Sequence, residues 1–150
     1  MKQSNLRDQA GGTAQQLMTL IVGDLLVILS FVWVGRSSHH LSITDLAASL
    51  STALPFILGW FVIMPWFGVY HPDISRMAKK LIPRLILGWL IAGFVALILR
   101  NLFLGRPLIA GILPTFAIVS MGYIGLLIVV WRLVYIWRSG RRQANSGASL

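Results

Sequence analysis

Four long apolar segments separated by short polar stretches make up most of this chain. They cover about residues 17–34, 46–70, 81–104 and 112–138. An α-helix needs about 20 consecutive apolar residues to cross the hydrocarbon core of a bilayer, and each segment supplies about that number. The pattern predicts an all-α fold: an integral membrane bundle of four transmembrane helices.

The two ends of the chain lack this apolar pattern. Residues 1–16 hold Gly11, Gly12 and several amide side chains, and residues 139–150 are first basic and then small and polar. Terminal segments of this kind are usually poorly ordered. We therefore expect mobile tails on either side of one transmembrane domain over residues 17–138.

Two stretches leave the helix boundaries open. Residues 42–45 end in Asp45, whose side chain can cap a second helix that begins near residue 46. Pro55 then either kinks this helix or begins its spanning part after an interfacial segment. Residues 108–113, a short apolar stretch after a Gly-Arg-Pro break, either re-enter the membrane or lie on it.

Composition and charge agree with a membrane protein. Hydrophobic residues make up 57% of the chain, charged residues only 11%, and the formal net charge is +9. The basic residues lie at the ends of the apolar segments, as orientation in a membrane requires, so we expect no nucleic-acid partner. The absence of cysteine excludes disulfides and thiolate metal sites.

The distribution of basic residues predicts the orientation. One side of the membrane would hold both termini and the loop at residues 71–84. This side carries Lys2, Arg7, Arg76, Lys79, Lys80, Arg84, Arg138, Arg141 and Arg142, and the other carries Arg36, Arg100 and Arg106. Because cytoplasmic loops are enriched in Lys and Arg, we expect a multi-pass protein of the cytoplasmic membrane with both termini inside.

An acid and a base lie inside the predicted spans. Asp24 is about seven residues from the inner end of the first helix, and Arg132 is about six residues from the inner end of the fourth. At 1.5 Å per residue these positions are roughly 10 Å and 9 Å deep. Charges inside a membrane usually face the bundle interior and pair. We therefore predict an intramembrane ion pair, which either fixes helix register or takes part in gating a polar route.

Small residues mark the predicted helix-packing face. Gly88, Ala92 and Ala96 recur at four-residue spacing, and in hydrocarbon such stripes allow close helix approach. Two glycines also precede tryptophans whose indole N–H groups need partners. The predicted packing residues are Gly23, Gly59, Trp60, Gly88, Trp89, Ala92 and Ala96. The stripe contacts either another helix of this chain or a second copy.

A second polar group is expected on the outer side. It comprises Arg36, Ser38, His39, Asp45 and Arg100. Arg100 can extend outward to meet Asp45 or loop carbonyls. Pigment or haem ligation by His39, His40 or His71 is disfavoured, because adjacent histidines diverge and no further ligands complete a set. We expect no metal site and no cofactor.

Several of these residues resemble a bacterial and archaeal membrane family called domain of unknown function 3054. The resemblance covers roughly residues 20–136. It rests on Gly23-Asp24, Phe31, Gly35-Arg36-x-Ser38-His39, Pro55-Phe56-x-x-Gly59-Trp60, Arg100, Phe116 and Trp131-Arg132. It implies a small multi-spanning protein without an established activity, so it assigns no catalytic or binding residues.

Catalytic motifs are absent from the sequence. It holds no G-x-S-x-G, H-E-x-x-H, Walker or dinucleotide fingerprint and no paired carboxylates. We therefore expect a non-enzymatic accessory or assembly subunit of a larger bacterial membrane complex, with lipids, other subunits or itself as partners. The alternatives are a small oligomeric permease or ion channel that uses the layer of Asp24 and Arg132, and a membrane-embedded lipid or quinone enzyme.

Overall fold

The computed structural model describes residues 2–40 and 44–147, which are helical apart from short turns. Its elements are α1 (Lys2–Ser38), α2 (Leu46–Ile63), the 3₁₀-helix η1 (Met64–Phe67), α3 (Pro72–Ser75), α4 (Ala78–Phe103) and α5 (Pro114–Gly147). Four helical stretches are long and apolar enough to cross a membrane: Gly12–Ser38, Leu46–Phe67, Ala78–Phe103 and Pro114–Arg141. This confirms the expected all-α membrane bundle of four spans.

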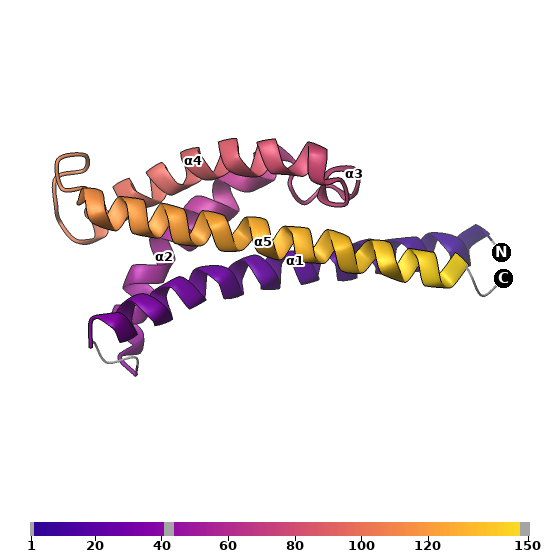
Figure 1. The fold of residues 1–150 in the computed structure, drawn as a ribbon, viewed down its shortest axis with the longest axis horizontal. Coiled ribbons are helices and arrows are strands. Elements are labelled where there is room, and N and C mark those ends of the chain that lie inside the picture. The colour runs from indigo at the N-terminus through magenta and orange to yellow at the C-terminus, as the bar shows by residue number, and fades with distance from the viewer. Residues whose placement is uncertain (1, 41–43, 148–150) are drawn as a thin grey trace.

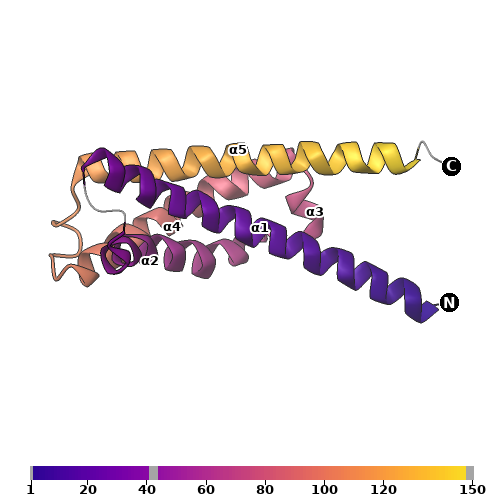
Figure 2. The same ribbon diagram turned by 90° about the horizontal axis from the view of Figure 1, so that it is seen from below.

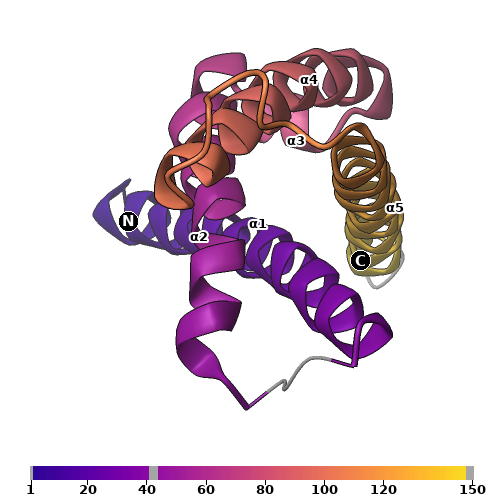
Figure 3. The ribbon, with the colours of Figure 1, turned by 90° about the vertical axis from the view of Figure 1, so that its left-hand side faces the viewer.

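The four long helices form a closed ring. α1 packs against α2 and α5, and α4 packs against the same two helices. Figure 3, which looks along the bundle, shows α2 between α1 and α4, with α5 on the other side of the ring. Both termini lie at one end of the bundle, here called the terminal end (Figure 1). The opposite end, with the α1–α2 and α4–α5 connections, is called the distal end.

The start of α2 follows the sequence prediction. Asp45 caps the helix, since its Oδ1 accepts a hydrogen bond of 3.0 Å from the Ala48 amide. The helix then continues through Pro55 to Ile63, so the structure shows one helix that includes the proline rather than a start at Pro55.

The apolar stretch at residues 108–113 forms turns at the distal end (Figure 1). Its first residue is tied back to α4, because the Asn101 side-chain amide donates a 3.0 Å hydrogen bond to the Leu108 carbonyl. The Gly111 amide donates a hydrogen bond to the Pro107 carbonyl, which forms a further turn. The segment therefore lies at the distal end and does not turn back into the bundle, and its position relative to the membrane stays a prediction.

α1 and α5 extend beyond their expected boundaries. α1 begins at Lys2 instead of about residue 17, and α5 ends at Gly147 instead of about residue 138. Adding residues to an existing helix avoids the cost of nucleation, so weak local patterning does not stop these helices. With 37 and 34 residues, they measure roughly 50–56 Å. Past α3 they run on and spread apart at the terminal end (Figure 2).

Apolar side chains divide between the bundle core and its outer surface. In the distal half, the Phe31 ring of α1 lies 5.5 Å from Phe56 of α2 and 6.1 Å from Phe116 of α5, measured between centroids. Trp66 and Ile118 are instead 87% and 73% exposed. Large exposed apolar side chains suit contact with lipid, which solvates them as well as a protein core does.

The small-residue stripe of α4 faces α2 and η1 of the same chain. A Cβ atom added to Gly59 would lie 2.7 Å from the Ala92 carbonyl oxygen and 3.1 Å from the Ala96 Cβ. One added to Gly88 would lie 2.9 Å from the Met64 Sδ atom. The backbones thus approach too closely for larger side chains, and van der Waals contact holds α2 against α4.

Gly59→Ala should therefore destabilise the protein. The added methyl group meets backbone, which cannot rotate away, so we expect a loss of about 1–3 kcal/mol and a lower Tm in detergent. Gly35→Ala is the matched control, because nothing lies within 4 Å of its added Cβ; it should leave the Tm unchanged or raise it. Equal Tm values for the two variants would contradict this packing.

Candidate functional site

Asp24 of α1 and Arg132 of α5 lie together inside the bundle. Arg132 Nη2 is 2.5 Å from Asp24 Oδ2, and Arg132 Nε is 3.1 Å from Asp24 Oδ1. The contact is bidentate, the geometry that gives the strongest charge-assisted hydrogen bonds. The two side chains are 0% and 1% exposed, so neither reaches lipid or solvent.

Three further groups complete this buried cluster. The Tyr70 hydroxyl donates to Asp24 Oδ2 at 2.8 Å, and the Trp60 indole N–H lies 3.1 Å from the same oxygen and 2.8 Å from the Tyr70 oxygen. Arg132 Nη1 donates to the Val69 carbonyl at 3.2 Å. An ionised carboxylate only accepts hydrogen bonds, so the Tyr70 hydroxyl is the donor in its contact with Asp24.

Two glycines allow these residues to meet. The Trp131 ring occupies the space beside Gly23, where an added Cβ would overlap the ring atoms. The residue pairs 23–24 and 131–132 therefore bring α1 and α5 into close contact at the ion pair.

Gly68 has a φ of 66°, a left-handed conformation that glycine adopts without strain.

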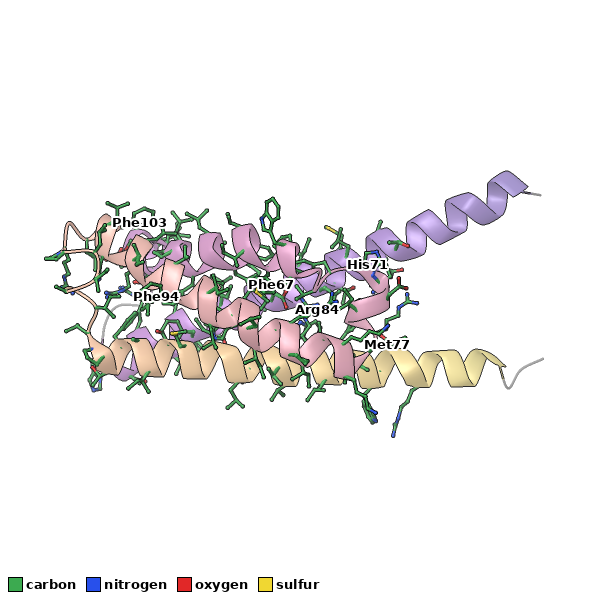
Figure 4. The ribbon with its side chains drawn as sticks, turned by 90° about the horizontal axis from the view of Figure 1, so that it is seen from above. Phe67, His71, Met77, Arg84, Phe94 and Phe103 are labelled. Atoms are coloured by element: carbon green, nitrogen blue, oxygen red, sulfur yellow. The ribbon has the colours of Figure 1, made fainter. Side chains whose placement is uncertain are left out.

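The turn at Gly68 returns the chain toward the cluster. After η1 it places Val69 and Tyr70 against Arg132, whose guanidinium carbon lies 5.0 Å from the centroid of the Tyr70 ring. Figure 4 shows Phe67 within the bundle and His71 at its terminal end. The connection between α2 and α3 is thus a structural part of the cluster and not only a loop outside the membrane.

The charged and polar groups of the cluster bond to one another. The carboxylate accepts from Arg132, Tyr70 and Trp60, and the guanidinium donates to the carboxylate and to a backbone carbonyl. Because charge and hydrogen-bond donors are balanced inside, the desolvation cost of each ion is offset by its neighbours. This arrangement suits a structural lock between helices, since it leaves no group facing a substrate.

The other predicted polar group serves separate local contacts. Ser38 bonds back to the Val34 carbonyl at 2.8 Å, and Asp45 caps α2. The Arg100 guanidinium carbon lies 4.0 Å from the Phe116 ring centroid, a cation–π contact, whereas the partners predicted for it were Asp45 or loop carbonyls. Arg36 is half-buried and His39 is exposed. The expected gathering of these residues into one outer polar group stays a prediction.

The histidines do not gather with other ligands. His40 is exposed, and His71 Nδ1 lies 3.5 Å from Asp73 Oδ2 on the surface. Across residues 2–40 and 44–147, no group of three or more His, Cys, Asp or Glu side chains that the structure describes is placed to hold a metal ion.

Some members of the cluster are not evident from the sequence. Trp60 was expected only as a packing residue, and Tyr70 and Val69 were not expected in the site. The signal available for Tyr70 was its place at the inner end of an apolar segment, which is common for interfacial aromatics. The Trp89 indole, by contrast, finds its partner in the Met121 carbonyl at 2.9 Å and links α4 to α5.

The fold and this buried ion pair define a small, all-helical, multi-pass membrane protein. Within that class, the chain belongs to the family described as "Protein of unknown function (DUF3054)", whose model matches residues 21–135. No curated protein and no solved structure matches the chain. The matched range includes Asp24 and Arg132 and leaves out most of the two projecting helix ends.

Breaking the ion pair should strongly destabilise the fold. Arg132→Leu leaves an unpaired buried carboxylate, and we expect a loss of about 3–5 kcal/mol, measured by thermal unfolding in detergent. Asp24→Asn should also destabilise the protein, because it leaves the Arg132 guanidinium buried without its carboxylate. The double variant should lose less than the sum of the two single losses, because it buries no unpaired charge. If Arg132→Leu folded with an unchanged Tm, the pair would not hold α1 to α5.

The Tyr70 hydroxyl should contribute less to the stability of the protein than the ion pair does. Tyr70→Phe removes one hydrogen bond to a charged acceptor, worth about 1.5–3 kcal/mol, and should lower the Tm. Tyr123→Phe is the control, since that ring packs 5.8 Å from Phe31 and its hydroxyl has no hydrogen-bond partner among residues 2–40 and 44–147. A larger Tm loss for Tyr123→Phe would contradict the assignment.

Proposed function

We propose that this protein is a non-enzymatic accessory or assembly subunit of a larger membrane complex. The closed cluster around Asp24 carries the proposal. An ion path or a catalytic site needs a polar group that faces water or substrate, whereas this carboxylate is 0% exposed and engages three donors. The polar interior therefore supports a role in holding the bundle together.

A groove on the membrane-facing surface supports contact with another subunit. It lies between α4 and α5, has a volume of about 290 Å³, and is lined by Leu85, Ile86, Trp89, Leu90, Met121, Gly122, Gly125, Leu126, Ile128 and Val129. All of these are apolar, and nothing lies within 4 Å of a Cβ added to Gly122. A glycine beside open space lets a second backbone approach closely in hydrocarbon. The occupant that we propose is an apolar transmembrane helix of a partner subunit.

The proposed orientation places both termini in the cytoplasm. The terminal end carries Arg76, Lys79, Lys80, Arg84, Arg138 and Arg141, and the distal end carries Arg36, Arg100 and Arg106. This asymmetry supports insertion in the cytoplasmic membrane with the terminal end inside.

Photo-crosslinking in native membranes tests this function. A photoreactive side chain at Leu126, which is 66% exposed in the groove, should crosslink to one transmembrane segment of a different protein, identified by peptide sequencing. Gly122→Leu should reduce that adduct about tenfold by filling the groove. A probe at Ile118, which is on the same helix but outside the groove, should not give the adduct.

Other outcomes would overturn the proposal. Adducts with lipid alone, or only with a second copy of this chain, would show that no other subunit occupies the groove. Ion flux in proteoliposomes that Asp24→Asn abolishes, with assembly unchanged, would favour the permease or channel instead.

A further inference from the structure

A polar cavity lies at the terminal end, between the parts of α1 and α5 that run toward the termini. Its volume is about 380 Å³, within the range of small-ligand sites. The polar and charged side chains in its wall are Gln15, Gln16, Thr19, Arg76, Arg138 and Ser139. Trp131 and Tyr135 add aromatic surface. It is separate from the buried cluster and from the groove between α4 and α5.

Both cationic side chains of this cavity are available to an anion. Arg76 is positioned by Gln16, whose Oε1 accepts from Arg76 Nη2 at 2.5 Å, and Gln16 in turn donates to the Ser75 hydroxyl at 2.8 Å. Among the residues that the structure describes, this bond engages one of the five N–H donors of the Arg76 guanidinium group. Arg138 is exposed and has no acidic partner among the side chains that the structure describes.

The surrounding charges favour an anionic ligand. Among the described side chains, Asp73 is the only acid at this end, and its Oδ2 faces His71 Nδ1. Lys79, Lys80 and Arg84 add positive charge on the first two turns of α4. Such a basic surface attracts anionic lipid headgroups at the inner face of a membrane.

The depth of the cavity fits a lipid headgroup. Thr19 precedes Asp24 by about five residues, or roughly 7–8 Å along α1, and Trp131 is the neighbour of Arg132 in the sequence. The cavity therefore lies just on the terminal side of the buried cluster, in the part of the bundle where α1 and α5 spread apart (Figure 2). Trp and Tyr side chains are enriched at this level of a bilayer.

We propose that this cavity binds the phosphate group of an anionic phospholipid in the leaflet at the terminal end. Arg138 and Arg76 contact the phosphate oxygens, Thr19 and Ser139 add neutral donors, and the two aromatic rings cover the glycerol region. Inorganic phosphate shares the same recognition chemistry, so the experiment separates the two sources. The proposal does not depend on the accessory role.

Native mass spectrometry of the full chain in mild detergent tests the site. We expect the wild type to retain added phosphatidylglycerol, and Arg138→Gln to weaken retention about tenfold through loss of charge-assisted hydrogen bonds. Arg141→Gln removes the same charge three residues further along, where the guanidinium carbon lies 3.9 Å from the Trp137 ring centroid. It should change retention less than twofold. An equal loss in both variants would show diffuse attraction and overturn the site.

A second pair of variants tests the cavity without changing charge. Gly12 lines the cavity and has nothing within 4 Å of an added Cβ, so Gly12→Phe should fill the space and lower retention about tenfold. Gly140→Phe, also with open space but outside the wall, should not. Unchanged retention in Gly12→Phe would contradict binding in the cavity.

The third comparison identifies the source of the phosphate. Inorganic phosphate at millimolar concentration should not displace phosphatidylglycerol, because only the lipid also contacts the aromatic wall. Displacement that depends on Arg138 would instead make free phosphate the ligand and overturn the assignment to lipid.

Discussion

The Asp24–Arg132 ion pair joins residues that are 108 positions apart, and the closure of the helix ring depends on it. In a bilayer, apolar surface gains little by turning from lipid to another helix, so burial alone does not select one arrangement. A buried charge does select, because any arrangement that separates it from its partner leaves an ion in hydrocarbon. This one contact therefore specifies which faces of α1 and α5 meet.

Close packing and the ion pair act at different helix contacts. Along α2 and α4, Gly59 accommodates Ala92 and Ala96, and dispersion over short distances holds these helices. Between α1 and α5 the polar cluster has this role, and Trp60 connects the two systems. Its indole bonds to Asp24, and its ring lies 5.7 Å from that of Trp89. The buried cluster around Asp24 and the packed contact between α2 and α4 are thus continuous with each other.

The terminal end combines this lock with a surface suited to the membrane interface. Trp131 fills the space beside Gly23 and also lines the polar cavity. A ligand in the cavity would therefore contact Trp131, which belongs to the same α1–α5 contact as the ion pair. Gln16 and Arg76 extend the contact to the α3 region, so the helix ends, the α2–α3 connection and the buried cluster meet within a short distance.

The hydrophobic pattern by itself determined the class of fold and the number of spans, because these follow from residue spacing along a helix, and it predicted that Asp24 and Arg132 share one level of the bundle. It also indicated Asp45 as a cap, which is a local interaction. The return of Tyr70 and Val69 to the cluster, the position of Gln16 and the neighbour of the α4 stripe were decided by tertiary structure alone. Each depends on contacts between segments distant in sequence, and apart from the ion pair, which charge indicated, residue spacing does not encode which helix faces meet.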